Sequence, residues 1–184
     1  EKLTYRGMVL IYLVLSTASF TEYDAHYFPG ADIPISRLSE PKNYSASTEP
    51  SDRTVLCAEL PSDTDEPLWR ASDDALGRLV LIALEDAGIP VQVPVKDVTV
   101  RRLRHAYPVY RRGYQTDFAA LDRYLDGMES ILSFGRQGLF VHDNTHHALA
   151  MGYAAADCLD RDGRLDRQKW SAYRRVFESH VVED

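Results

Sequence analysis

Hydrophobic and polar positions along the chain follow two periods, one typical of strands and the other of helices. Apolar, β-branched or aromatic side chains dominate residues 4–20, 54–60 and 91–104, which predicts three strands. Residues 23–44 contain three prolines, so they are expected to form short strands or extended segments broken by turns. Together these segments predict a sheet as the scaffold of the chain.

Three other segments show the helical spacing of apolar residues. The first begins after Ser72, a suitable N-cap, and ends at Gly88, a suitable C-terminal stop. The second covers about residues 117–132. The last is an amphipathic helix near the C-terminus that carries Trp170 and Phe177.

A fourth helix is expected over the alanine-rich residues 148–156, after an abrupt change from apolar to polar residues. Residues 139–141 are too few for anything but a buried strand segment. Asp143, Asn144 and Thr145 are all suitable caps for the helix that follows. This arrangement would place backbone N–H groups and a carboxylate at a strand end, where cofactors commonly bind in open α/β sheets.

Strands and helices therefore alternate irregularly along the chain. The expected fold class is α/β with α+β character. It would be a mixed-sheet substrate domain with helices on one side, joined to the returning strand and helix of a Rossmann-like domain.

Composition narrows the classes of function. At 184 residues and 45% hydrophobic content, the chain can bury one substantial core. Its net charge of −7 disfavours nucleic acid or an anionic membrane as the main partner. The longest apolar run, residues 8–15, is too short to cross a bilayer, and Cys57 and Cys158 do not make a disulfide framework. A reducing, cytoplasmic setting is expected.

Two groups of residues suggest a metal site, but neither has the arrangement of ligands that such a site requires. His142 and His146 are four residues apart, but one is expected at a strand end and the other in a first helical turn. One histidine is instead expected to line an active site or donate to a cofactor. Asp160, Asp162 and Gly163 predict a turn, because the first and last carboxylates of a calcium loop are missing.

Residues 134–152 begin with a Gly-Arg pair and continue to an acidic residue and a helix of small residues. This segment resembles the C-terminal signature of FAD-dependent oxidoreductases of the amine oxidase, protoporphyrinogen oxidase and UDP-galactopyranose mutase group. Residues 23–29, 36–44 and 106–110 resemble the substrate-domain strands of the mutase-like branch. The resemblance covers most of residues 1–160.

The resemblance implies FAD as cofactor, with specific contact residues for FAD and for substrate. The expected FAD contacts are Gly135, Arg136, Asp143, Asn144 and Thr145. The expected substrate contacts are Arg37, Tyr107, Tyr110 and His146. No general base is identified. On the residues alone, Arg136 and Asp143 also fit a helix cap beside a surface arginine, and the arginines near Tyr107 also fit a solvated strand face.

The glycine-rich loop that such enzymes need for the FAD pyrophosphate, Gly-x-Gly-x-x-Gly, does not occur in the sequence. The chain is therefore expected to be the C-terminal portion of a longer enzyme and to be inactive alone. Its expected partners are the N-terminal FAD-binding segment of the same protein and a small-molecule substrate. The expected domains are residues 1–133 for substrate, 134–159 for the strand and helix of the FAD domain, and 160–184 for a terminal helix.

The function expected first is a flavin-dependent oxidoreductase that moves a hydride to or from flavin. The second is a mutase-like isomerase in which reduced flavin attacks a nucleotide-sugar. The third is a non-catalytic fragment or binding module.

Overall fold

The computed structural model describes residues 3–45, 49–129 and 131–179. Two compact units make up the chain. The sheet unit is Arg6–Ala106, and the helical unit combines the residues up to Tyr5 with those from Tyr107 onward. The sequence-based domain limits at residues 133 and 159 stay a prediction.

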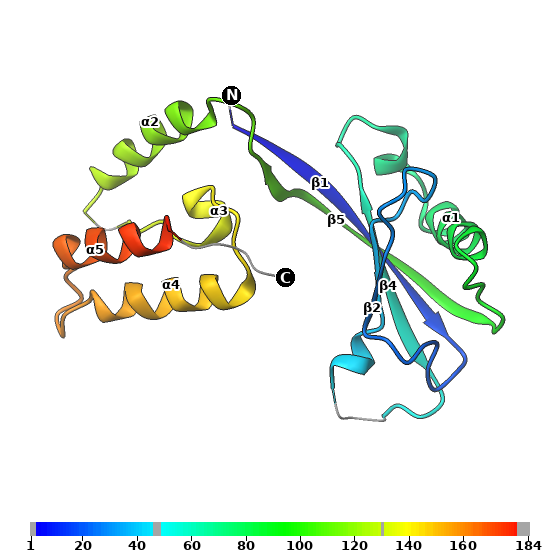
Figure 1. The fold of residues 1–184 in the computed structure, drawn as a ribbon. Helices are drawn as coiled ribbons and strands as arrows, with labels where there is room; N and C mark the ends of the chain where they lie inside the picture. Colours follow the sequence, from blue (N-terminus) through cyan, green and yellow to red (C-terminus); the bar gives the residue numbers. More distant parts are fainter. Residues whose placement is uncertain (1–2, 46–48, 130, 180–184) are drawn as a thin grey trace. The chain divides into compact units, whose positions relative to one another are not determined.

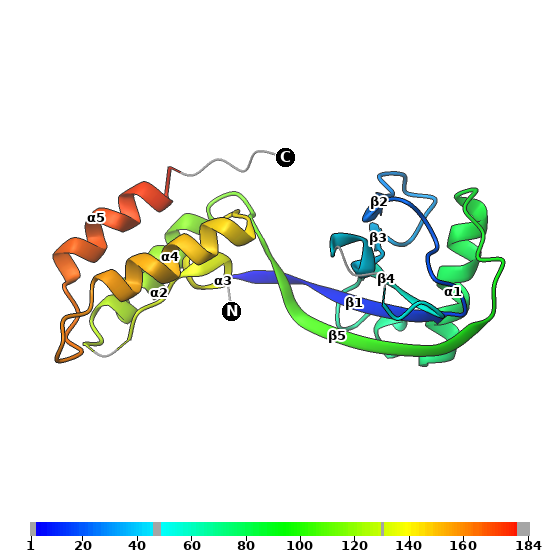
Figure 2. The same ribbon diagram turned by 90° about the horizontal axis from the view of Figure 1, so that it is seen from below.

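Five strands form one sheet in the order β2-β3-β4-β1-β5 (Figures 1 and 2). The strands are β1 (Thr4–Leu15), β2 (Ala25–Tyr27), β3 (Arg37–Ser39), β4 (Thr54–Pro61) and β5 (Val95–Val109). Neighbouring strands run antiparallel. The expected α+β character is therefore confirmed, and the expected mixed sheet is wrong. Antiparallel neighbours need only short connections, which the turns around the prolines of residues 23–44 provide.

Helix α1 (Asp73–Asp86) covers one face of this sheet (Figure 1). Every second residue is buried from Val9 onward in β1 and throughout β4, as expected for strands with one face in the core. The buried members are Val9, Ile11, Leu13, Leu15, Leu56, Ala58 and Leu60, packed with Leu76, Val80, Ala83 and Leu84 of α1. The predicted start and end of α1 are confirmed: the Ser72 hydroxyl accepts from Ala75 N at 3.2 Å, and Gly88 adopts a φ of 78°.

Close approach of α1 to the sheet depends on one glycine. A Cβ at Gly77 would lie 3.0 Å from a methyl carbon of Val98 on β5. The absent side chain therefore lets the helix backbone approach this strand.

The buried carboxylate of Glu40 holds several loops of the sheet unit together. Glu40 is 1% exposed and precedes the 3-10 turn Pro41–Tyr44. Its oxygens accept from Phe20 N at 3.0 Å, Thr21 N at 2.9 Å, Thr54 Oγ1 at 2.6 Å and Asn43 Nδ2 at 3.4 Å. A second 3-10 turn, Pro67–Arg70, carries the buried Trp69. Glu40 thus connects three segments that are distant in sequence.

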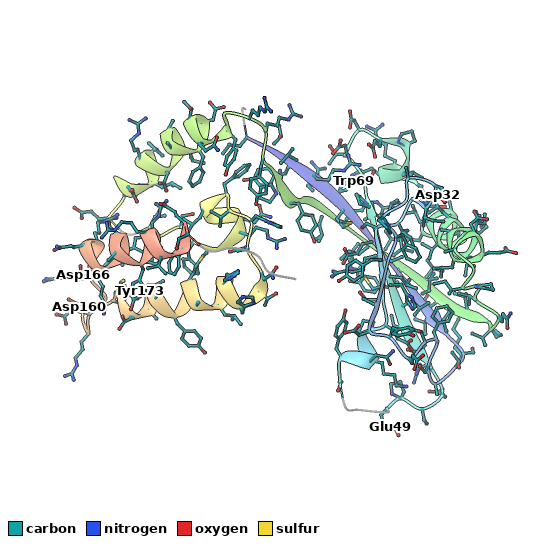
Figure 3. All side chains as sticks on the ribbon, viewed as in Figure 1. Asp32, Glu49, Trp69, Asp160, Asp166 and Tyr173 are labelled. Atoms are coloured by element: carbon teal, nitrogen blue, oxygen red, sulfur yellow. The ribbon has the colours of Figure 1, made fainter. Side chains whose placement is uncertain are left out.

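The helical unit has its own core. It contains α2 (Tyr114–Asp126), α3 (Gly135–Leu139), α4 (Thr145–Asp157) and α5 (Arg167–Phe177). The core residues are Leu139, Met151, Ala154, Ala155, Cys158, Trp170 and Phe177. The predicted turn at residues 160–163 is confirmed: Asp160 Oδ1 accepts from the backbone N of Asp162 and Arg164, and the turn leads to α5, which Asp166 caps (Figure 3).

The strand predicted over residues 139–141 is wrong. Leu139 ends α3, and Phe140 adopts a left-handed conformation with a φ of 51°. No strand follows β5 among the described residues, where only an isolated bridge joins Leu159 to Leu165. Phe140 is buried for another reason: its ring packs among the aromatic rings of Tyr5, Tyr110, Tyr114 and Phe118, with centroid separations of 5.2–6.2 Å.

We expect Glu40→Gln to destabilise the chain by about 1–3 kcal/mol. Both carboxylate oxygens accept hydrogen bonds, so the amide nitrogen of Gln would face a donor. Urea unfolding measures the change, with the exposed Glu22→Gln as a matched control expected to stay within about 0.5 kcal/mol. Equal unfolding midpoints for the two variants would contradict the structural role of Glu40.

Candidate functional site

The five expected FAD-contacting residues lie together in the helical unit, around α3 and the start of α4. Gly135 is the first residue of α3 and has a φ of 79°, which favours glycine. Arg136 follows it. Asp143 precedes Asn144, the N-cap of α4, and Thr145 is the first residue of that helix.

Arg136 binds Asp143 through both backbone and side chain. Its Nε donates to the Asp143 carbonyl oxygen at 3.1 Å, and Nη2 donates to the same oxygen. Nε also lies 3.4 Å from the carboxylate oxygen Oδ1. The guanidinium therefore joins α3 to the residue that leads into α4, and it sets the path of the loop between them.

One carboxylate oxygen of Asp143 has no partner among the described residues. Asp143 is 2% exposed, and its Oδ2 is buried without a hydrogen bond. Such a group costs about 1–3 kcal/mol, and unpaired buried acceptors are rare in folded proteins. A hydroxyl donor would satisfy this oxygen, which fits the chemistry of a ribityl hydroxyl. To reach Oδ2, a ligand would have to displace side chains that cover it.

Two tyrosines expected to contact substrate stand beside the arginine. The Tyr107 ring lies against the Arg136 guanidinium, 5.1 Å from its central carbon, as in a cation–π contact. Tyr110 contacts the rings of Phe140 and His142, with centroid separations of 5.5 and 6.3 Å. Tyr107 and Tyr110 are 40% and 38% exposed, so both offer ring surface to a ligand.

The phenol of Tyr110 is a hydrogen-bond donor at neutral pH. Burial raises the pKa of Tyr110 to about 12, and the positive charge of Arg136 only partly offsets this effect. A protonated phenol beside an arginine can bind a carbonyl, hydroxyl or phosphate oxygen.

His146 lies beside another histidine, and its assignment as a substrate residue stays a prediction. His146 contacts the neighbouring His147, with ring centroids 4.0 Å apart and the two Nε2 atoms 3.1 Å apart. His147 Nδ1 in turn accepts from the backbone N–H of Asn144 at 3.1 Å. The histidine beside the tyrosines is His142. Sequence reasoning missed the cap by His147, although its position three residues after Asn144 is where a capping box has its second side chain.

Arg37 belongs to the sheet unit and already has an acidic partner. It faces Glu59 across the β3–β4 pair, and its Nε donates to Glu59 Oε1 at 3.0 Å. The Glu59 side chain is largely buried. Any substrate contact by Arg37 would therefore involve a guanidinium that the sheet already holds in place. Its assignment as a substrate residue stays a prediction.

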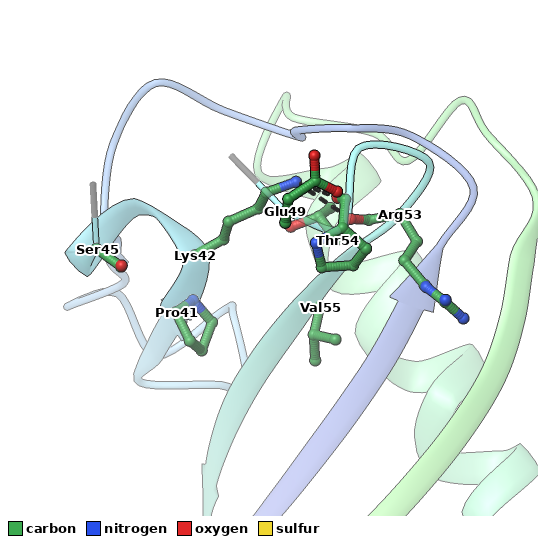
Figure 4. Close-up of a pocket in the computed structure, with 8 residues that line it drawn as sticks. Pro41, Lys42, Ser45, Glu49, Arg53, Thr54 and Val55 are labelled. Atoms are coloured by element: carbon green, nitrogen blue, oxygen red, sulfur yellow. Dashed lines mark hydrogen bonds between the residues drawn. The ribbon is translucent and has the colours of Figure 1, made fainter. Parts of the chain in front are cut away.

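The sheet unit also contains a cavity of about 360 Å³ between the 3-10 turn Pro41–Tyr44 and the start of β4 (Figure 4). The Lys42 ammonium in its wall donates to three carbonyl oxygens, those of Ala18 at 2.7 Å, Pro50 at 2.6 Å and Arg53 at 3.3 Å. The other lining residues are Pro41, Ser45, Glu49, Pro50, Arg53, Thr54 and Val55. Because these carbonyl oxygens already bind the Lys42 ammonium, that cation is not available to a ligand.

Within residues 3–45, 49–129 and 131–179, no three His, Cys, Asp or Glu side chains gather as a metal site. In the same part of the chain, no helix has the length and apolar character needed to cross a membrane.

Comparison with known proteins supports the fold but not a family. No family profile matches the sequence, and neither does any curated protein. The structure is similar to reduced UDP-galactopyranose mutase, with a TM-score of 0.70 and 18% identity over 85% of this chain and 33% of that one. It is also similar to a putative protoporphyrinogen oxidase from Exiguobacterium sp. 255-15, with a TM-score of 0.53 and 20% identity over 66% and 27%.

The chain shares its fold with parts of both structures. Both neighbours are of types named in the sequence resemblance, so that resemblance is confirmed at the level of the fold. The chain spans about a third of the length of the mutase and less of the oxidase. At these identities the likeness carries architecture only.

We expect Arg136→Lys to destabilise the helical unit by about 1–3 kcal/mol, because an ammonium cannot reproduce the two-nitrogen contact with the Asp143 carbonyl. Trp170 fluorescence during urea unfolding, in a Trp69→Phe background, reports on this unit. The exposed Arg112→Lys is the matched control and should change little. Identical curves would show that Arg136 does not hold the loop.

Proposed function

We propose that this chain is the substrate-binding and C-terminal FAD-contacting part of a flavin-dependent oxidoreductase. The observation that carries the proposal is the contact of Arg136 with Asp143. The buried Asp143 carboxylate, just before α4, has one unpaired oxygen, and Arg136 of α3 holds this residue in place. It lies in a chain whose fold is similar to parts of UDP-galactopyranose mutase and of a putative protoporphyrinogen oxidase.

FAD, when bound, would accept or deliver the hydride at its N5 atom. The residues of this chain would bind and orient it. Asp143 would accept from a ribityl hydroxyl, and Arg136 would hold Asp143 in place. The first turn of α4, with Asn144 and Thr145, would place the positive end of the helix near the electron-rich edge of a reduced flavin.

Substrate would contact the exposed rings of Tyr107 and Tyr110. The protonated phenol of Tyr110 would donate to a substrate oxygen, and the ring would cover an apolar or sugar face. These contacts support a small-molecule substrate. They supply no general base, which is consistent with a reaction that depends mainly on orientation against the flavin.

The FAD pyrophosphate would be held by another segment of the same protein. The 184 residues lack the glycine-rich loop, and the chain covers 33% of the mutase and 27% of the oxidase that it resembles. An N-terminal FAD-binding segment is therefore the proposed partner of this chain.

A mutase-like isomerase is the second candidate. The observation that supports it is the similarity to UDP-galactopyranose mutase, with a TM-score of 0.70 over 85% of the chain. Such an enzyme would change the ring of a nucleotide-sugar only after the flavin is reduced, with no net oxidation. Product analysis with reduced and oxidised FAD separates the two: a ring change without net redox supports the isomerase, and net substrate oxidation supports the oxidoreductase.

In the whole polypeptide that contains this chain, we expect Asp143→Ala to weaken FAD binding about tenfold or more. Hydrogen bonds to charged groups contribute about 1.5–3 kcal/mol, and about 1.4 kcal/mol corresponds to tenfold in affinity. Titration followed by flavin fluorescence measures the affinity.

The control for this experiment is Asp162→Asn in the exposed turn before α5, which should bind FAD like the wild type. Equal affinities for both variants would remove Asp143 from the cofactor site. A purified wild-type polypeptide without flavin absorbance, even after FAD is added, would instead favour a non-catalytic binding module.

A further inference from the structure

The start of α4 is capped by a histidine where most capping boxes have Glu or Gln. His147 Nδ1 accepts the backbone N–H of Asn144 at 3.1 Å, and Asn144 reciprocates toward the backbone of His147. On its other side, His147 Nε2 lies 3.1 Å from His146 Nε2. The two rings and the N-cap thus form a continuous chain of hydrogen bonds.

This chain assigns every ring proton. Because Nδ1 of His147 accepts, its proton must be on Nε2, and that N–H must donate to Nε2 of His146. His146 then has its own proton on Nδ1. In this arrangement Nδ1 of His147 carries no proton, since a proton there would turn the acceptor of the Asn144 N–H into a donor.

The surroundings oppose a positive charge on His147. The N-terminus of α4 already has the partial positive charge of a helix dipole. Besides His146, the ionisable side chains next to it along the chain are those of His142 and Asp143, in the loop before Asn144. Asp143 is bound by Arg136, and His142 lies against Tyr110.

We propose that His146 and His147 form a proton-sensitive latch on the first turn of α4. In the neutral form the latch holds the Asn144 amide and closes the turn. Protonation of His147 releases that amide and loosens the turn directly after Asp143. The proposal stands on the chain itself; only its consequence, a pH-dependent hold on FAD, rests on the proposed function.

The test uses the chain without flavin. Nitrogen NMR of the imidazoles should show His147 in the Nε2–H form and His146 in the Nδ1–H form at about pH 8. Between about pH 8 and about pH 5, the hydrogen-exchange protection factor of the Asn144 amide should fall about fivefold or more, the size expected for loss of a helix cap.

His147→Gln is the matched control, because Gln at this position accepts the Asn144 N–H and does not titrate. In this variant the protection of Asn144 should stay constant over the same pH range. His147→Ala should lack the protection at every pH. An Nδ1–H tautomer of His147 at high pH, or an equal loss of protection in the wild type and His147→Gln, would overturn the latch.

These readouts separate the latch from the cofactor proposal. Failure of FAD binding in the whole polypeptide leaves the NMR and exchange results unchanged. If the latch exists and FAD binds, the ratio of FAD affinities at high and low pH should be larger in the wild type than in His147→Gln.

Discussion

The helical unit depends on the contact between the Arg136 guanidinium and the Asp143 carbonyl oxygen. Arg136 uses two nitrogens on the backbone oxygen of Asp143, which closes the loop between α3 and α4 from inside. Without it, Phe140 in its left-handed conformation and the buried Asp143 would have to be held by packing alone. The position of the α4 N-terminus, and therefore of every group near it, follows from this contact.

Among the residues that the structure describes, Glu40 and Asp143 are the buried carboxylates, and their hydrogen bonds give them different roles. Glu40 has partners on both oxygens, including two backbone amides, so its burial is stabilised within the sheet unit. Asp143 pairs one oxygen with Arg136 at a long distance and leaves the other unpaired. An energy deficit of about 1–3 kcal/mol at a buried acceptor is unusual in a purely structural residue. It is this difference that makes Asp143 the better candidate for ligand contact.

The sequence predicted the parts of the fold that have a period and a cap. Helix α1 has both, and its limits at Ser72 and Gly88 match the structure. Residues 139–141 have neither, because three apolar residues fit a strand as well as a helix end. Phe140 is buried among aromatic rings that are distant in sequence, and Leu139 in the core of the helical unit, which no local pattern reveals. The pair of Arg37 and Glu59 depends on the register of β3 with β4, which local pattern does not contain.

At the candidate site, too, local sequence predicted only part of the arrangement. The loop that unites Arg136, Asp143 and Asn144 is short in sequence, so these residues could be grouped in advance. The assignment of the histidines could not, because it depends on which ring nitrogen meets the Asn144 amide. His146 and His142 differ in sequence position by one helical turn, yet one contacts a histidine and the other a tyrosine.

The titratable groups of the chain restrict the chemistry that it can perform by itself. Burial raises the pKa of the thiols of Cys57 and Cys158, so neither of the two cysteines is a thiolate nucleophile at neutral pH. Tyr110 also stays protonated. What remains near Asp143 is a set of donors, one acceptor and a fixed cation, which can bind and orient a molecule but cannot move a hydride. In the proposed oxidoreductase, FAD would supply that hydride chemistry.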